Sequence, residues 1–231
     1  MQLNPFNQTI GDALADFTPG AIPQVEVLEG QTVLVEKLTE KHLDDLYEVY
    51  EPTSPLQNWT YLPIEPFTDK DSFTSYFQQI VASKDPFHFA IVDKTSKKAL
   101  GTVALMRIDT QNRVLEMGWV VYSTTLQRSR QATEAQYLLM KYVFEDLGYR
   151  RYEWKCDSLN QPSHNAALRL GFTYEGSLRQ AAVYKGRNRD TNWFSILDKE
   201  WPTNKKRLED WLTAENIDEN GLQKTRLSTI N

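Results

Sequence analysis

Residues 113–135 read RVLEMGWVVYSTTLQRSRQATEA, and this stretch decides the fold. An apolar strand pattern over residues 114–122 runs into a polar turn, and the turn opens directly into an amphipathic helix. Such an arrangement aims several unpaired backbone N–H groups at one point, where the positive end of the helix dipole adds to them. The stretch therefore predicts a binding site for a phosphate group.

A second informative segment, residues 160–172, reads NQPSHNAALRLGF. Asn160 is a typical helix cap, Pro162 suits the first turn of a helix, and Ser163 supplies a first-turn hydroxyl. Gly171 is placed to end the helix in a left-handed conformation. The segment predicts a short, well-delimited helix that begins beside its polar cap.

The chain has 231 residues, 40% of them apolar, which suffices for one sizeable core. It has no run of 18 apolar residues, and Met1–Phe6 lacks the pattern of a secretory signal. The only cysteine, Cys156, fits a reducing cytosol, and we interpret it as a buried apolar side chain rather than a nucleophile. Three isolated histidines beside one cysteine make no metal-ligand cluster. We therefore expect a cytoplasmic protein without a metal or a membrane partner.

The net charge of −5 is unevenly distributed along the chain. Residues 1–66 carry eleven acids against Lys37 and Lys41, whereas residues 123–190 carry eleven Lys or Arg against seven acids. Such a split can attract an anionic cofactor to one end and a cationic substrate to the other; two ordinary solvated surfaces are the alternative. Because no basic stripe is interleaved with aromatic residues, nucleic acid is not an expected partner.

Helix and strand patterns alternate along the chain, and several neighbouring strands are joined by turns that only antiparallel pairs permit. Residues 1–30 predict an extension packed on the domain, residues 31–200 the domain, and residues 201–231 a helix and a polar tail. Strands are predicted over residues 31–38, 88–92, 100–108, 114–122, 152–157, 176–184 and 191–198. Helices are predicted after Thr39, around Phe73–Val81, over residues 132–147 and over residues 163–170, with an irregular proline-rich segment at residues 51–66. The pattern predicts a mixed sheet with helices on both faces.

In their order and spacing, the two informative segments resemble the acetyl-coenzyme A site of the GNAT superfamily of N-acetyltransferases. The resemblance covers residues 31–200. Residues 30–35, 127–135 and 186–191 point to the RimJ/RimL-like branch, whose namesakes acetylate the N-termini of ribosomal proteins, and residues 169–176 resemble the closing segment of the family. It implies a mixed α/β (α+β) GNAT fold in a single domain, with a mostly antiparallel, splayed sheet, acting as a monomer or homodimer.

The resemblance also implies which residues hold the pyrophosphate of coenzyme A. They are Gln127, Arg128, Ser129, Arg130, Gln131, Ala132 and Thr133. Gln127 and Ala132 match the family pattern, whereas Arg130 stands where the middle glycine belongs and Arg128 replaces another frequent glycine. A guanidinium can pair bidentately with phosphate oxygens and so compensate; an exposed basic turn is the alternative.

Three further roles follow from the resemblance. In the family the strand before the turn splays from its neighbour, and a freed backbone N–H, here at Val121 or Tyr122, meets the thioester carbonyl; a fully paired strand is the alternative. Asn160 and Ser163 face coenzyme A near its sulfur, where the Ser163 hydroxyl can protonate the leaving thiolate. Glu116 takes the proton of the amine, unless it is only an exposed or salt-bridged strand residue.

His88 and His164 are alternative bases, although each also suits a structural role. The acceptor amine is expected beside the acidic half of the chain, against Tyr47–Tyr61 and Phe73–Phe77. The leading hypothesis is direct transfer of an acetyl group from acetyl-coenzyme A to a primary amine in a ternary complex. The acceptor is a protein or peptide N-terminus or a small amine. A non-catalytic acyl-coenzyme A binding module is the competing interpretation.

Overall fold

A computed structural model describes residues 2–52, 55–219 and 223–230. Its centre is an eight-stranded sheet whose strands are hydrogen-bonded in the order β3-β4-β5-β6-β7-β8-β10-β9. The strands are β3 Val27–Glu29, β4 Val33–Lys37, β5 Phe87–Asp93, β6 Ala99–Asp109, β7 Val114–Tyr122, β8 Arg151–Asp157, β9 Thr173–Tyr184 and β10 Arg187–Leu197. Among the strand pairs of the described residues, only β7–β8 is parallel, because the connection between these two strands is long enough to carry a helix. The predicted mixed, mostly antiparallel sheet is confirmed.

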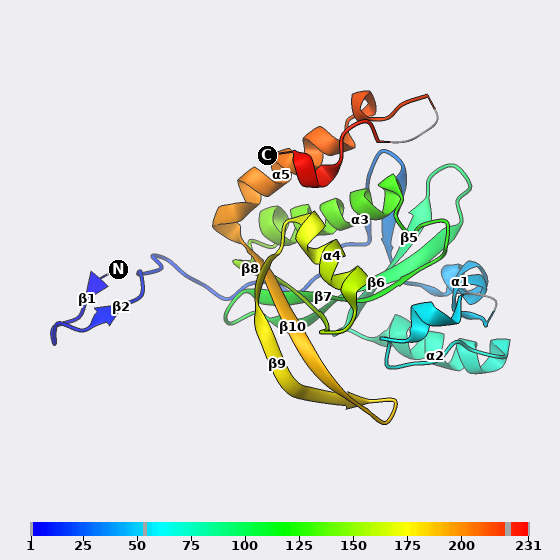
Figure 1. The fold of residues 1–231 in the computed structure, drawn as a ribbon, viewed down its shortest axis with the longest axis horizontal. Helices are drawn as coiled ribbons and strands as arrows, with labels where there is room; N and C mark the ends of the chain where they lie inside the picture. Colours follow the sequence, from blue (N-terminus) through cyan, green and yellow to red (C-terminus); the bar gives the residue numbers. More distant parts are fainter. Residues whose placement is uncertain (1, 53–54, 220–222, 231) are drawn as a thin grey trace.

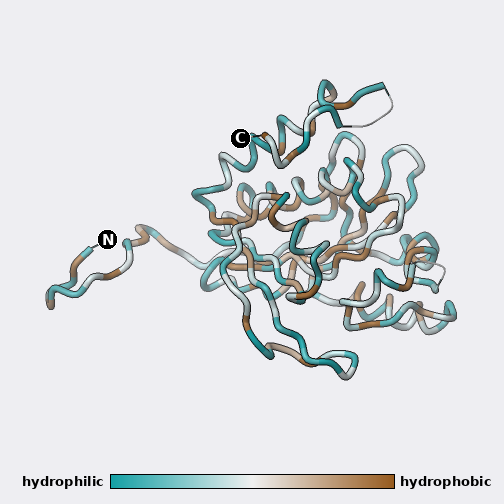
Figure 2. Tube along the Cα trace, viewed as in Figure 1, coloured by the Kyte–Doolittle hydropathy of each residue, from teal (hydrophilic) through white to brown (hydrophobic). Residues whose placement is uncertain are grey.

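Helices cover both faces of the sheet, as predicted (Figure 1). They are α1 Leu43–Tyr50, α2 Lys70–Ala82, α3 Arg130–Lys141, α4 Gln161–Leu170 and α5 Trp201–Leu212, with short helical turns at Glu40–His42, Leu56–Trp59, Tyr142–Asp146, Asp198–Glu200, Ala214–Asn216 and Leu227–Thr229. On one face, α3, α4 and α5 enclose the larger core. On the other, α1 and α2 enclose a second cluster that includes Phe73 and Phe77, two members of the predicted stripe. Figure 2 shows hydrophobic positions concentrated in the strands and helices of these layers.

The side chains of β7 do not alternate strictly between the two faces of the sheet. Leu115 and Met117 enter the larger core, but Val121 enters the opposite cluster. The cause is a β-bulge: Gly118 pairs with Ala104 and Val121 with Thr102, so Trp119 and Val120 face one residue of β6. Trp119 adopts a left-handed conformation with φ +50°, and every side chain beyond it is turned to the other face.

The pairing of β7 with β8 stops halfway along both strands. It runs from Val114–Arg151 to Met117–Trp154, after which β7 continues to Tyr122 and β8 to Asp157 without pairing to each other. The sheet is therefore open between the carboxyl ends of two parallel strands. This is the splay that the family resemblance implies.

The ends of the chain differ from the expected extension and polar tail. Residues 18–29 do contact the domain: Tyr149 Oη donates to the carbonyl of Ala21 at 3.0 Å, and β3 pairs with β4. Residues 2–16 instead lie away from the domain, with a small hairpin of β1 Gln2–Leu3 and β2 Thr9–Ile10 (Figure 1). The tail after α5 is not merely polar surface, because Leu227 is buried in the larger core.

Two glycines allow neighbouring elements of the fold to approach closely. A Cβ on Gly30 would lie 2.7 Å from a carboxylate oxygen of Glu134, so Gly30 lets this buried side chain of α3 approach the start of β4. Gly171 has φ +98° and ends α4 as predicted, and Asn204 of α5 fills the space where a Cβ would stand.

Candidate active site

The polar turn after β7 leads directly into the N-terminus of α3. The Ser129 side chain caps the helix by accepting the backbone N–H of Ala132 at 3.0 Å, so α3 begins at Arg130, slightly earlier than expected. Arg128 adopts a left-handed conformation with φ +58° and its side chain is exposed. Glycine favours that conformation, which explains why glycine is frequent at this point of the family's turn.

The other side chains of the turn are held by the protein. Arg130 Nη2 donates to Gln31 Oε1 at 2.7 Å and to the carbonyl of Leu212, so this guanidinium is directed at the framework. Gln131 Nε2 contacts the Asp93 carboxylate. Of the two arginines expected to meet phosphate, only Arg128 carries an uncommitted, exposed guanidinium.

The end of β7 directs one backbone N–H into the opening of the sheet. The N–H of Ser123 donates to the carbonyl of Leu100 on β6 at 2.9 Å. Because successive residues of a strand point their backbone groups to opposite sides, the Tyr122 backbone points away from β6, toward β8. Consistently, the carbonyl of Tyr122 accepts Gln127 Nε2 at 3.2 Å. Of the two expected donors, the geometry favours Tyr122 over Val121.

The N-terminus of α4 faces the same open end, since α4 follows β8 as α3 follows β7. Asn160 caps the helix by accepting the N–H of Ser163 at 3.2 Å, as predicted. The Ser163 hydroxyl oxygen accepts the indole N–H of Trp154 at 3.0 Å, which leaves its own proton available to a neighbour. Cys156 is buried and burial raises the pKa of its thiol, which fits an inert apolar role.

Glu116 lies on the other face of the sheet within a chain of buried charges. Lys155, whose side chain is 6% exposed, places its Nζ 2.9 Å from Glu116 and 2.7 Å from Glu153, and 3.7 Å from the ring centre of Trp193. Arg107 Nε adds a further contact to Glu116 at 3.3 Å. Burial raises the pKa of Glu116, while Lys155 acts in the opposite direction.

The two histidines proposed as alternative bases have different surroundings. His88 is buried on β5, and its Nδ1 has no hydrogen-bond partner among the described residues. Burial lowers the pKa of His88 to about 4, so its imidazole is neutral at pH 7. His164 packs against the rings of Tyr174 and Phe194 and contacts Asn192 at 3.3 Å, which is a structural position.

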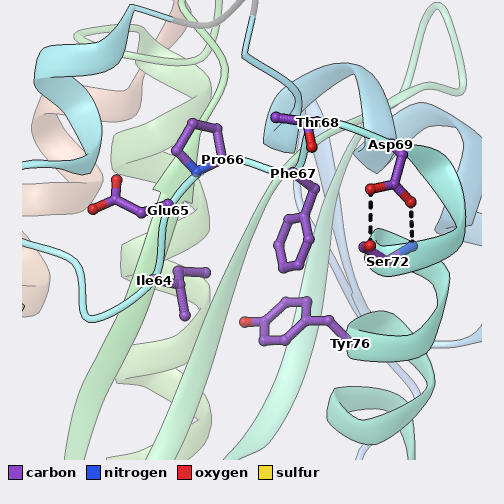
Figure 3. Close-up of a pocket in the computed structure, with 8 residues that line it drawn as sticks. All are labelled: Ile64, Glu65, Pro66, Phe67, Thr68, Asp69, Ser72 and Tyr76. Carbon is purple, nitrogen blue, oxygen red and sulfur yellow. Dashed lines mark hydrogen bonds between the residues drawn. The ribbon is translucent and has the colours of Figure 1, made fainter.

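A surface pocket of about 420 Å³ lies between α2 and the segment before it (Figure 3). Its lining residues are Ile64, Glu65, Pro66, Phe67, Thr68, Asp69, Ser72 and Tyr76. The ring of Tyr76 lies against Phe67, with ring centres 5.0 Å apart, and Asp69 accepts both the N–H and the hydroxyl of Ser72. Of the residues expected to line the acceptor site, Tyr47–Tyr61 and Phe73–Phe77, only Tyr76 borders this pocket, and Phe73 and Phe77 are buried in the core.

The acidic excess of the N-terminal half is partly neutralised within the fold. Six of its acids form ion pairs: Glu26 with Lys37, Glu29 with Lys94, Glu36 with Lys41, Asp44 with Lys70, Glu48 with Lys98 and Glu65 with Lys185. Four of these lysines lie outside residues 1–66, so counting charges by segment overestimated the negative electrostatic field of the N-terminal half. Lys185 also ties the β9–β10 turn to this region by donating to the carbonyl of Trp59 at 2.8 Å.

Three charged residues with clear positions were missed from sequence. Lys155 pairs with Glu116 as described above. Arg169, near the end of α4, donates to the Thr133 hydroxyl at 3.0 Å and so brings a second cation to the first turn of α3. Glu134 accepts the backbone N–H of Thr32 at 2.9 Å and anchors α3 to β4. Only the position of Lys155, two residues from Glu153 on a strand, offered a sequence signal.

Comparison with known proteins identifies the class to which this fold and site belong. Residues 32–173 match the family of the acetyltransferase (GNAT) domain. The chain is 30% identical to the uncharacterized N-acetyltransferase p20 of Bacillus licheniformis over 176 residues, which cover 74% of this chain and 98% of p20. The chain therefore belongs to the GNAT family and is an acetyl-coenzyme A-dependent acetyltransferase.

Solved structures agree with that assignment. A GCN5-related N-acetyltransferase from Brucella melitensis is 44% identical and superposes with a TM-score of 0.92 over 94% of this chain and 99% of that one. A GNAT-family protein from Chromobacterium violaceum is 38% identical with a TM-score of 0.78, covering 86% of this chain and all (100%) of its own. Among the described residues, no helix is long and apolar enough to cross a membrane.

Proposed function

We propose that the acceptor is a primary amine, either a protein or peptide N-terminus or a small amine, as in the RimJ/RimL-like branch. The amine attacks directly while both substrates are bound. The observation that carries this proposal is the opening between β7 and β8, the two strands that lead into the N-termini of α3 and α4. A thioester lying in that opening is accessible from the face of the sheet that carries Glu116.

The cosubstrate fits the residues present at the opening. The capped start of α3 and the exposed guanidinium of Arg128 suit a pyrophosphate, with Ala132 too small to hinder its approach. The turn is held in shape by Gln127, Ser129, Gln131 and Thr133. Arg130 supports the turn from the side that faces the framework. The N–H of Tyr122 is available to the thioester carbonyl, where negative charge grows during transfer.

Acetyl-coenzyme A supplies the activated acetyl group when bound. The amine nitrogen bonds to the acetyl carbon, the carbon–sulfur bond breaks, and the ammonium proton passes to the Glu116 carboxylate, directly or through water. Ser163 donates its hydroxyl proton to the departing sulfur and takes up a proton from solvent in return. Burial, which raises the pKa of Glu116, makes it a stronger base than a solvated carboxylate.

The acceptor enters beside Glu65 and Tyr76, at the pocket in Figure 3, whose lining includes the rings of Phe67 and Tyr76. An apolar neighbour of the amine suits these rings, and an ammonium group at Glu65 competes with Lys185, which lies 2.8 Å from that carboxylate.

The decisive experiment is an acceptor panel read by release of free thiol from acetyl-coenzyme A. N-terminal peptides, polyamines and aminated metabolites are compared at equal concentration. Glu65→Gln should raise the KM for the accepted amine and leave the KM for acetyl-coenzyme A unchanged. The matched control is Glu48→Gln, because Glu48 is similarly exposed and paired with a lysine, but lies outside the pocket. Coenzyme A binding without thiol release for any amine would refute this proposal and favour a binding module.

A further inference from the structure

The first residues of the chain form an ordered arm that leaves the domain (Figure 1). We define the arm as residues 2–16. Its root is fixed, because the ring of Phe17 lies under the guanidinium groups of Arg113 and Arg150, 5.1 and 5.5 Å from its centre. The arm is therefore held in direction by its root while making few contacts with its own domain.

The tip of the arm is a preformed turn that presents apolar side chains to solvent. Asn4 Oδ1 accepts the backbone N–H groups of Phe6 at 2.9 Å and Gln8 at 3.0 Å, which holds the turn between β1 and β2. Phe6 is 81% exposed and Leu3 is 66% exposed. An isolated two-stranded hairpin is marginally stable in water at best, so an ordered one with an exposed aromatic tip is expected to pack on something.

The edge strand β9 has the complementary feature, a surface that another chain can cover. The strand β9 is an edge strand of 12 residues that pairs only with β10, so one of its sides presents unpaired backbone groups. Leu178 and Val183 on β9 are 52% and 78% exposed. A long, exposed edge strand with apolar side chains is a surface that another chain can cover.

The charges of the two surfaces are complementary. The arm carries Asp12 and Asp16 and no Lys or Arg, a net charge of −2. Residues 173–190, which form β9 and the start of β10, carry four basic residues and two acids, a net charge of 4 − 2 = +2. This sum is unchanged when the ion pairs of Lys185 with Glu65 and of Glu175 with Arg151 are left out, because 3 − 1 = +2. The basic residues are Arg179, Lys185, Arg187 and Arg189. Opposite charges favour encounter of the arm with residues 173–190. Like charges oppose the pairing of two arms or of two copies of residues 173–190.

We propose that the arm of one chain docks on the exposed β9 strand of a second copy, in a two-fold symmetric dimer. Each protomer carries one arm and one β9 strand. The arm of each protomer docks on the β9 strand of the other, so two identical contacts form and the dimer is closed, as a two-fold axis requires. Phe6, held by its turn before association, is the anchor of each contact, since rigid aromatic side chains contribute most at interfaces. The β9–β10 turn is bonded to Trp59 and Glu65, so the second copy also braces the acceptor pocket.

Cross-linking of single-cysteine variants tests this contact in the full chain. Cys156 is buried, so a new surface cysteine is the reactive one. Phe6→Cys chains are mixed with Val183→Cys chains of different mass and mildly oxidised. The expected product is a disulfide-linked heterodimer. Phe6→Cys mixed with Leu168→Cys is the matched control, because Leu168 is exposed and apolar but lies on α4, and it should give no such product.

Sedimentation equilibrium supplies an independent measurement. Phe6→Glu should weaken dimerisation by at least about a hundredfold, because the symmetric contact is lost twice and burial of one Phe is worth roughly tenfold or more each time. Leu168→Glu should leave the dissociation constant unchanged. A chain that is monomeric up to roughly 100 µM, well above micromolar dissociation constants, would overturn the proposal. So would a disulfide that forms only within one chain carrying both Phe6→Cys and Val183→Cys, because the arm would then dock on its own β9.

Discussion

Replacing Lys155 by Met should show whether water reaches the buried charged side chains around Glu116. The Met side chain keeps most of the apolar stem of Lys155 but removes the ammonium that lies 2.9 Å from Glu116 and 2.7 Å from Glu153. Both carboxylates are less than a tenth exposed, so the change leaves two buried acids beside each other, each with only an arginine contact: Glu116 with Arg107 at 3.3 Å and Glu153 with Arg151 at 2.7 Å. Breaking a buried ion pair in this way costs about 3–5 kcal/mol of unfolding free energy. For a chain of this length that corresponds to a fall of about 6–20 °C in Tm.

The assay is urea unfolding followed by tryptophan fluorescence, with Lys98→Met as the matched control. Lys98 pairs with Glu48 at 3.5 Å, but both side chains are exposed, so its loss should cost at most about 1 kcal/mol. Burial already raises the pKa of Glu116, and removing Lys155 removes an influence that lowers it. An acid whose folded pKa is raised is most stabilising when protonated, so the deficit of Lys155→Met should shrink as pH falls toward 4 and grow toward pH 8. Equal losses in the two variants, or a deficit independent of pH, would mean that water reaches Lys155.

Four further outcomes are expected. Arg128→Glu should weaken binding of acetyl-coenzyme A at least tenfold in calorimetry, since a phosphate contact becomes repulsive, whereas Arg130→Glu should act mainly through lost stability. Ser163→Ala should lower kcat by roughly 10²–10⁴ with little change in cofactor affinity; an unchanged kcat would leave Ser163 only its contact with Trp154. Glu116→Gln should lower turnover near neutral pH and recover partly as pH rises and more amine is already deprotonated; wild-type rates throughout would move the base elsewhere, with His88 next to test. Burial lowers the pKa of His88 to about 4, so as the pH falls His88 is protonated in the unfolded chain before it is protonated in the folded chain. The wild type should therefore lose up to about 3 kcal/mol of stability between pH 6.5 and 4. His88→Gln should flatten that slope in urea midpoints measured across the same range, and an equally steep slope would show that another group causes it.

The elements that sequence predicts well are those whose signals are local. The strand β7 spans the predicted range, the helical spacing of Phe73, Phe77 and Ile80 recurs in α2, and the cap at Asn160 forms the expected bond. In each case the residues that decide the structure lie within a few positions of one another.

The missed features depend on partners far along the chain. The bulge at Trp119 arises from the register with β6, which no pattern within β7 specifies. Arg130 is drawn to Gln31 and Leu212, 99 and 82 residues away, and not toward the expected phosphate. Likewise, the acids of the N-terminal half meet lysines from α2, the β5–β6 turn and the β9–β10 turn, so a count by segment could not show their neutralisation.

The halted pairing of β7 and β8 makes the sheet two half-sheets joined along a short seam. One half-sheet holds β3 to β7 and the other holds β8, β10 and β9, and only four residue pairs, from Val114–Arg151 to Met117–Trp154, join them. Regions that share few backbone bonds can open separately from global unfolding. The two half-sheets are therefore expected to exchange amide hydrogens as distinct cooperative units. A ligand seated at the open end of the seam contacts both units, so it should slow exchange on both sides of the sheet at once and make the unfolding of the whole domain more cooperative.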